Sequence, residues 1–465
     1  MLLFFMGSIP VSLAKASKFQ IVDFAIKGLT GSIAGDLERL QGLGRLNFDD
    51  NRLGRGDIDD LNFLIFLANC TSVEVLLGNL INLTFLGLEE NYSSGSVPVV
   101  TGRLHKLGEL HMYYNNFSRE NSKIFGKSER FGSHGNIPAA IGNLVNLTLL
   151  GLEENYSSGS VPVVTGRLHK IGELHMYYNN FSGSIPSSFG NLTSLTTFFM
   201  QRNKFVGSIP PSLGNCQKLQ ILNLSRKNLD GTIPEQVLGP SSLSVSLAMS
   251  HKFFTGSLPL EVDNLKNLNE LDFSGNKLKF SSQIPSSLGS CTSLAYLHLG
   301  SNTFEGKIPK SLENLRGLEE LDFSSKNLTG QIPKFLSKLV SLRHLDLSFN
   351  ELDGEVSREG IFANASAIFL IGNDKLCGGV SELLLPVCSR KKPRKLLTPN
   401  VIRVIIAVTL ALLMLCSFGI YLRVKNSRRH STALFSSDGQ PSLSYSDISK
   451  STNNFSEENT RLKKP

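Results

Sequence analysis

A two-part motif returns about every 24 residues along most of this chain, a period typical of repeat proteins. The first part is a glycine, any residue, a β-branched residue or leucine, and usually a proline, as in "GSIP" at Gly183. The second part reads L-x-x-L-x-L-x-x-N-x-L, as in "LRHLDLSFNEL" from Leu342 to Leu352. Units of this kind bury their apolar sides by stacking on their neighbours. The pattern therefore predicts a solenoid. The glycine of the motif recurs at Gly7, Gly31, Gly135, Gly159, Gly183, Gly207, Gly231, Gly256, Gly306, Gly330 and Gly354.

The repeat resembles the extracellular leucine-rich repeat of plants. The resemblance covers nearly everything before Val380 and implies an α/β fold of about 14 coils, with a parallel β-sheet on the concave face. In each coil the leucines of L-x-L point inward, and the residues beside them point to the concave face. The asparagine that closes the strand turns inward, because its amide can pair with backbone groups that would otherwise be buried without a partner. This ladder is predicted at Asn51, Asn179, Asn203, Asn276, Asn302 and Asn350.

Lysine replaces the ladder asparagine in four coils, at Lys27, Lys227, Lys252 and Lys326. An ammonium group has only donors and is costly to bury. We expect these side chains to turn outward and the coils to loosen locally.

A long stretch of the chain occurs twice. Asn79–Ser118 matches Asn143–Ser182 at all but three positions, which is far closer than the other repeats resemble one another. We interpret it as a recent tandem duplication of two coils that added no new function, so that deleting 79–118 should leave ligand binding by the other copy intact. Residues 119–136 between the copies have no repeat pattern and are expected to be a loop, and a second irregular stretch lies at 74–80.

The two ends of the repeat array differ. Gly7 is in phase with Gly31, which favours a chain that begins within the array over one that begins with a signal peptide. At the other end, "NDKLCGG" and "LLLPVC" resemble the cap that closes such arrays, and the resemblance implies a disulfide between Cys377 and Cys388. The repeats are assigned to 1–376 and the cap to 377–389. Cys70, Cys216 and Cys291 are expected to be small buried residues, and no metal site or cofactor is predicted.

One apolar segment, at 404–422, has the length of a membrane-spanning helix. Most of the excess positive charge lies beside it, in a basic segment at 390–403 and in a tail at 423–465. Charge placed in this way is typical of a membrane-adjacent chain and argues against nucleic-acid binding. More Lys and Arg precede the segment than directly follow it, which alone would place the repeats inside the cell. The sequons and cysteines outweigh this count, and we predict a single-pass plasma-membrane protein with its N-terminus outside.

Eleven Asn-x-Ser/Thr sequons precede the apolar segment and predict an extracellular, glycosylated array. They stand at Asn69, Asn82, Asn91, Asn116, Asn146, Asn155, Asn180, Asn191, Asn223, Asn327 and Asn364.

The tail "SLSYSDISKSTNNFSEENTRLKKP" resembles the segment that leads into the kinase domain of plant receptor-like kinases. The sequence contains no Gly-rich loop of the form GxGxxGxV, no HRD and no DFG, so the chain as printed is not expected to be an enzyme.

Ligand binding is predicted on the concave face of the middle coils, because exposed aromatic and arginine side chains are typical of contact hot spots. The predicted contacts are His175, Tyr177, Tyr178, Phe199, Gln201, Arg202, Ser225 and Arg226, and the duplication supplies a second set at His111, Tyr113 and Tyr114.

The combined features resemble a plant leucine-rich-repeat receptor-like serine/threonine kinase of the immune pattern-recognition subfamily, truncated before its kinase domain. The resemblance implies an extracellular peptide or protein ligand, a co-receptor kinase as partner, and a role in immune or developmental signalling. The alternatives are a kinase-less decoy receptor, a secreted repeat protein that inhibits an enzyme, and a gene fragment without function. The apolar segment at 404–422 disfavours the secreted protein.

Overall fold

The computed structural model describes residues 7–15, 18–33, 37, 40, 42–68, 82–117, 135–226, 228–239, 242–251, 253–278, 284–324, 327–388 and 399–431. The chain divides into two compact units after Cys388. We describe each unit by itself.

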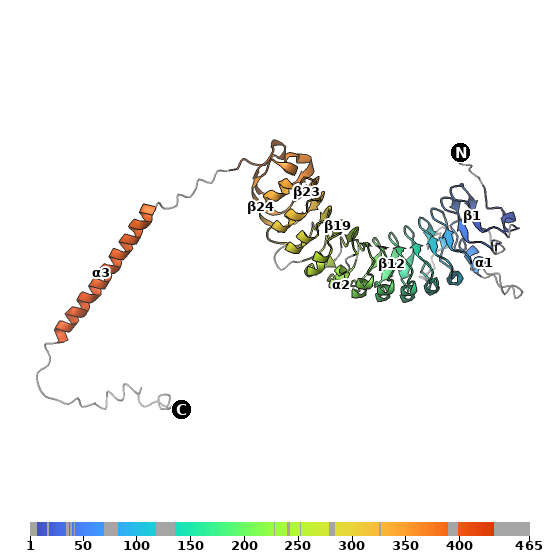
Figure 1. The fold of residues 1–465 in the computed structure, drawn as a ribbon, viewed down its shortest axis with the longest axis horizontal. Coiled ribbons are helices and arrows are strands. Elements are labelled where there is room, and N and C mark those ends of the chain that lie inside the picture. The colour runs from blue at the N-terminus through green and yellow to red at the C-terminus, as the bar shows by residue number, and fades with distance from the viewer. Residues whose placement is uncertain are drawn as a thin grey trace, which may run out of the picture. The chain divides into compact units, whose positions relative to one another are not determined.

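The first unit is built on one sheet of 14 parallel strands, which lie side by side in chain order (Figure 1). The predicted α/β leucine-rich-repeat solenoid of about 14 coils is confirmed. The strands are β1 (Ile21–Asp23), β3 (Arg45–Asn47), β5 (Phe85–Gly87), β7 (Glu109–His111), β9 (Leu149–Gly151), β11 (Glu173–His175), β13 (Thr197–Phe199), β15 (Ile221–Asn223), β17 (Ser246–Ala248), β19 (Glu270–Asp272), β20 (Tyr296–His298), β21 (Glu320–Asp322), β23 (His344–Asp346) and β25 (Ile368–Phe369).

The middle residue of each three-residue strand points into the core. In β11, Leu174 is fully buried, whereas Glu173 and His175 on either side are half-buried. Side chains alternate between the two faces of a strand, so this register puts the middle residue inside and the first residue on the concave face. The buried leucines of successive coils form one continuous core.

The asparagine ladder follows the sheet along its carboxyl edge. Nδ2 of Asn203 donates to the backbone carbonyls of Met176 and Met200, 2.8 and 3.1 Å away, and its Oδ1 accepts from the N–H of Phe181 at 3.0 Å. One side chain thus pairs backbone groups in its own coil and in the preceding coil. The predicted ladder is confirmed, and the same arrangement occurs at Asn91, Asn115, Asn155 and Asn373. Of the four lysines, only Lys27 lies within the described residues, where it is half-buried.

Short parallel strands follow the ladder and form small sheets of their own. They are β2 (Thr30–Gly31) with β4 (Arg52–Leu53), β6 (Ser94–Gly95) with β8 (Asn116–Phe117), β16 (Asp230–Gly231) with β18 (Phe253–Phe254), β10 (Ser158–Ser160) with β12 (Asn180–Gly183) and β14 (Lys204–Phe205), and β22 (Thr329–Gln331) with β24 (Glu351–Val356) and β26 (Lys375–Gly378).

The side of the coils opposite the main sheet is made of short helices. In the regular coils the motif glycine turns the chain, as at Gly183 with a φ of 76°, and the motif proline then precedes a 3-10 helix. A glycine adopts this φ without strain, which explains the motif. The helices are η1 (Val11–Lys15), η3 (Val99–Arg103), η4 (Ala139–Asn143), η5 (Val163–Arg167), η6 (Ser187–Asn191), η7 (Pro211–Asn215), η8 (Leu260–Asn264), η9 (Ser286–Ser290), η10 (Lys310–Asn314), η11 (Lys334–Lys338), η12 (Gly360–Ala363), η13 (Ala365–Ala367), η14 (Ser381–Leu383), α1 (Phe63–Ala68) and α2 (Glu235–Leu238).

Two coils are longer than the rest. Strand β3 pairs directly with β5, and β7 pairs directly with β9, although hydrogen bonds across each pair join residues 40 positions apart. Regular coils pair residues 24 positions apart. The extra residues of each long coil therefore add no strand to the sheet. The predicted irregular stretch at 74–80 lies outside the described residues, and so does the predicted loop at 119–136 except for its last two residues.

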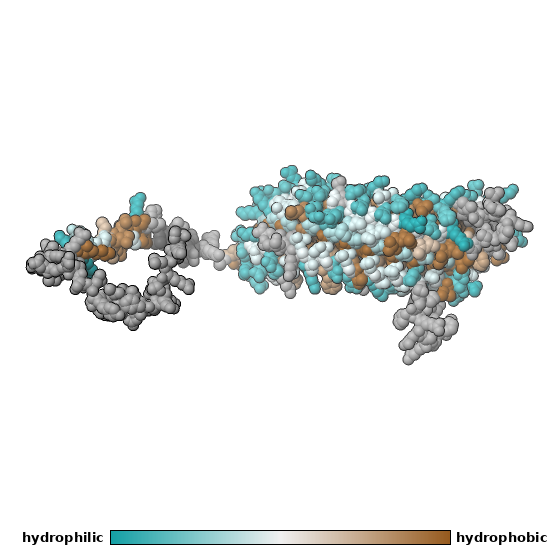
Figure 2. All heavy atoms as spheres, turned by 90° about the horizontal axis from the view of Figure 1, so that it is seen from below, coloured by the Kyte–Doolittle hydropathy of each residue, from teal (hydrophilic) through white to brown (hydrophobic). Residues whose placement is uncertain are grey.

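Near the boundary of the first unit, Cys377 and Cys388 are joined by a disulfide, with their Cα atoms 4.9 Å apart. The second unit contains one long helix, α3 (Pro399–Ser431), which includes 404–422 and is long and apolar enough to cross a membrane. Figure 2 shows apolar side chains along much of this helix.

Candidate functional site

The duplicated coils carry an unusual set of side chains on the concave face, which we call the acidic–aromatic surface. It lies over β5, β7, β9 and β11, which are neighbours in the sheet. The segments 84–92, 108–116, 148–156 and 172–180 contain six of the chain's nine tyrosines, six glutamates and two histidines, but no lysine or arginine. The members used below are Glu89, Glu109, His111 and Tyr113 from the first copy, and Glu153, Glu173, His175 and Tyr177 from the second.

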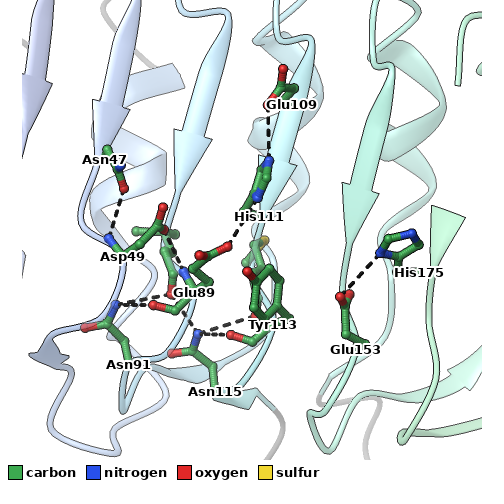
Figure 3. Close-up of polar contacts among 12 residues, drawn as sticks. Asn47, Asp49, Glu89, Asn91, Glu109, His111, Tyr113, Asn115, Glu153 and His175 are labelled. Carbon is green, nitrogen blue, oxygen red and sulfur yellow. Dashed lines mark hydrogen bonds and ion pairs between the residues drawn. The ribbon is translucent and has the colours of Figure 1, made fainter. Parts of the chain in front are cut away.

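In the first copy, one histidine bridges two carboxylates (Figure 3). Nδ1 of His111 lies 3.2 Å from Oε2 of Glu89 on the preceding coil, and Nε2 lies 3.2 Å from Oε2 of Glu109 on the same strand. Burial lowers the pKa of His111, but the hydrogen bonds to the two carboxylates outweigh burial and leave this pKa raised. Burial also raises the pKa of Glu89, and hydrogen bonds from His111 and Tyr113 reverse that effect, so that the pKa of Glu89 is lowered.

Asp49 adds a buried carboxyl group beside this bridge. It is 8% exposed, and its Oδ1 accepts a hydrogen bond from the backbone N–H of Glu89 at 3.0 Å. Burial and the nearby charge of Glu89 raise the pKa of Asp49 to about 7. Gly87 makes room for this group, because a Cβ there would lie 2.5 Å from Oδ1 of Asp49.

In the second copy the same residues are placed more loosely. Nδ1 of His175 lies 3.4 Å from Oε1 of Glu153, and Nε2 lies 3.4 Å from Oε2 of Glu173. The ring of Phe199 lies beside the histidine, 5.4 Å from that of His175 and 6.1 Å from that of Tyr177. Burial raises the pKa of Tyr177 to about 12, with a further contribution from the charge of Glu153.

The structure brings most of the predicted ligand contacts together. His175, Tyr177, Phe199 and Gln201 are half-buried neighbours on the concave face. Three others stand in the turns that follow the strands, where the φ of Tyr178 is 53°, that of Arg202 is 58° and that of Arg226 is 64°. The guanidinium of Arg202 lies 4.3 Å above the ring of Tyr178. The residues in these turns therefore adjoin the aromatic side chains of Tyr177 and Phe199.

Ser225 does not fit the predicted role. It is 7% exposed, and its hydroxyl accepts a hydrogen bond from the backbone N–H of Ser250 on the next coil at 3.1 Å. We therefore correct the prediction: Ser225 joins two coils and does not face a ligand.

An open pocket of about 560 Å³ lies along the turns of the duplicated coils. Four tyrosines line this pocket, and each is more than two-fifths exposed: Tyr92, Tyr114, Tyr156 and Tyr178. Because the repeated unit is two coils long, two of these tyrosines come from each copy.

Two of the predicted glycosylation sites belong to the buried ladder. Asn91 and Asn155 are each 6% exposed, and their Nδ2 atoms donate to backbone carbonyls as members of the ladder. A glycan is attached through that nitrogen, so neither residue can carry one in the folded coil. Asn82, Asn191 and Asn364 are exposed, and Asn69 lies outside the described residues. The remaining predicted sites are half-buried: Asn116, Asn146, Asn180, Asn223 and Asn327.

The buried cysteines have a packing role. Cys216 and Cys291 are fully buried, and their Sγ atoms donate to the backbone carbonyls of Phe189 and Val262. Burial raises the pKa of each thiol to about 11. Among the residues that the structure describes, no group of three or more His, Cys, Asp or Glu side chains could hold a metal ion.

The carboxylates of this surface are not among the predicted contacts. Asp49, Glu89 and Glu153 all stand two positions before a ladder asparagine, which is a concave position. The spacing "LGLEEN" contains this signal, because its asparagine belongs to the ladder as well as to a sequon.

Comparisons with known proteins agree with this architecture. A family model described as a leucine-rich repeat region matches residues 206–362, and a second model of the single leucine-rich repeat matches 170–192 and 194–216. The receptor kinase-like protein Xa21 of Oryza sativa subsp. japonica is 37% identical over 103 residues, which are 22% of this chain and 10% of that protein. A receptor-like protein kinase of Arabidopsis thaliana is 38% identical over 113 residues, which are 22% of this chain and 11% of that protein. These alignments therefore span about a tenth of either relative.

Among solved structures, the plant peptide hormone receptor RGFR1 in complex with RGF2 is similar, with a TM-score of 0.68 and 30% sequence identity. The match covers 80% of this chain and 54% of that receptor. The repeats described above thus agree in sequence and in fold with those of plant receptors. The chain carries leucine-rich repeats and is homologous, through them, to plant receptor-like kinases.

Proposed function

We propose that this chain is a single-pass cell-surface receptor that binds an extracellular peptide or protein ligand in plant immune or developmental signalling. In this proposal α3 crosses the plasma membrane, the repeats lie outside, and a co-receptor kinase is the signalling partner. The observation that carries the proposal is the concave cluster of His175, Tyr177 and Phe199, because half-exposed aromatic side chains on a rigid sheet are typical of protein-binding hot spots.

The site experiment uses the full chain in detergent micelles and a phage-displayed library of random 12-residue peptides. We expect the wild-type chain to retain specific peptides, and a Tyr177→Ala, Phe199→Ala double variant to lose most of them. Val340→Ala is the matched control, because Val340 is 94% exposed and lies in the turn between η11 and β23, away from the concave face. Equal retention by the double variant and the control would contradict the proposed site.

The membrane arrangement has a separate test. An epitope tag inserted after Cys388 should be accessible to antibody on intact cells. A tag detected only after the cells are permeabilised would reverse the proposed orientation.

A further inference from the structure

The two copies of the duplicated unit have the same sequence at these positions but differ in how their polar groups are paired. In the first copy, both ring nitrogens of His111 lie 3.2 Å from a carboxylate oxygen. In the second copy, the corresponding distances from His175 are 3.4 Å. The second histidine also lies beside Phe199, on a strand outside the duplication.

The second copy and the coil that follows it each contain a buried acceptor without a hydrogen bond among the described residues. The side chain of Glu153 is 6% exposed, and its Oε2 has no hydrogen-bond partner among the residues that the structure describes. Oε1 of Gln201, two coils further on, is also buried and has no such partner there. A buried polar atom without a hydrogen bond costs about 1 to 3 kcal/mol. Within the part of the chain that the structure describes, the other buried side-chain atoms in this condition are Nε2 of His175 and hydroxyls of the 3-10 helices, which lie on the opposite side of the coils.

The surroundings of Glu153 indicate which kind of group could hydrogen-bond to its Oε2. Its Oε2 lies 3.3 Å from the point where a Cβ of Gly151 would stand, and Cδ1 of Tyr113 lies 3.3 Å from the same point. The carboxylate thus extends over a strand that has no side chain there, next to an aromatic ring. Carboxylate and amide oxygens only accept hydrogen bonds, so the missing group is a donor.

The charge of the acidic–aromatic surface places a second requirement on the missing donor. The four strand segments of the acidic–aromatic surface contain six glutamates and no lysine or arginine. A donor that is also a cation would compensate this charge and could pack against the tyrosine faces. Arg202 above Tyr178 shows that a guanidinium fits such a ring on this protein.

We propose that Glu153 and Gln201 form a subsite for a basic residue, arginine or lysine, of an extended peptide that lies across β9, β11 and β13. The ammonium or guanidinium donates to Oε2 of Glu153 between Tyr113 and Tyr177, and a neighbouring donor of the peptide pairs with Oε1 of Gln201. This inference rests on the proposed function, because it specifies the ligand of the same receptor. It also departs from the expectation that the duplication added nothing, because Tyr113 belongs to one copy and Glu153 to the other.

The experiment selects peptides from the random 12-residue library on three forms of the full chain: wild type, Glu153→Gln and Glu320→Gln. Glu320 is the matched control, since it also contacts a histidine, His298, and is 41% exposed, but lies on β21, outside the acidic–aromatic surface. We expect arginine and lysine to be enriched in peptides selected by the wild type and by Glu320→Gln, and not in those selected by Glu153→Gln. A selected basic peptide should bind Glu153→Gln about ten-fold more weakly than wild type, because a buried charge pair loses one partner.

The outcomes separate the two proposals. The subsite is contradicted if the peptides that bind the wild type show no enrichment of basic residues, or if Glu153→Gln selects basic residues equally. Either result leaves the proposed peptide-receptor function unaffected. Failure of every form to select peptides contradicts the proposed function and the subsite together. If Glu153→Gln does not fold, as judged by its circular dichroism, Gln201→Leu replaces it, and unchanged affinity for the selected peptide then overturns the proposal.

Discussion

Oε1 of Glu153 lies 3.4 Å from Nδ1 of His175, which belongs to the next coil of the solenoid. The carboxylate is almost fully buried, and its other oxygen has no hydrogen bond among the described residues. Removing a charge from water costs free energy that a single ion pair only partly offsets. Glu153 is therefore expected to lower the stability of the ligand-free fold.

Replacing Glu153 by glutamine should leave the ligand-free chain equally stable or raise its unfolding free energy by about 1 kcal/mol. Glu89→Gln, the same change in the first copy, should lower it by about 1 kcal/mol, because Glu89 accepts hydrogen bonds from both His111 and Tyr113. Urea denaturation of the two variants measures the contrast. Equal losses in both would show that Glu153 is a structural residue.

Stability should depend on pH through Asp49. The pKa of this carboxyl is about 7 in the folded chain and about 3.9 in an unfolded one. Between those values the folded state binds a proton that the unfolded state lacks, so stability falls as pH rises from about 4 to 7. The raised pKa of His111 acts in the same direction, because the stability it contributes is lost as pH rises through its folded value. Glu89 acts oppositely, but only at acid pH, since its pKa is lowered.

Urea midpoints at pH 5 and pH 8 test this dependence. Asp49→Asn should raise the midpoint at pH 8 and reduce the difference between the two conditions. Asp50→Asn is the control, because Asp50 is exposed on the same turn. An unchanged pH dependence in Asp49→Asn would show that Asp49 is not responsible.

Loss of one ladder asparagine should destabilise the array. Asn203→Ala removes the donor to Met176 and Met200 and the acceptor for Phe181, all of which are buried. We expect a loss of about 3 kcal/mol in the free energy of unfolding, measured by urea denaturation. Asn180→Ala, at a half-buried position after the neighbouring ladder residue, should change it by less than about 1 kcal/mol. A small effect at both positions would contradict the role of the ladder.

Glycan occupancy should follow burial. In a chain expressed through the secretory pathway, we expect glycans on the exposed Asn191 and Asn364 and none on Asn155, whose Nδ2 donates to Met112 and Glu153. Mass spectrometry of glycopeptides measures each site. A glycan on Asn155 would require that its coil had not formed when the sugar was added.

The period, the strand positions and the ladder could be predicted from the sequence, because each repeat places the same residue types at the same backbone positions. The direct pairing of β3 with β5 could not, since nothing local shows that 40 residues make a single coil. The burial of particular side chains could not be predicted either. Ser225 occupies a concave position yet accepts a hydrogen bond from the next coil, and Asn155 fits both a sequon and the ladder. Only neighbours in space decide between those roles.

The duplicated unit is two coils long, so equivalent carboxylates recur on alternate strands, as Glu89 and Glu153 do. Neighbouring strands are about 4.8 Å apart, which gives these groups a repeat distance of about 10 Å along the solenoid. Each copy of the unit therefore places one carboxylate about 10 Å from the next, and another round of duplication would add one more at the same distance.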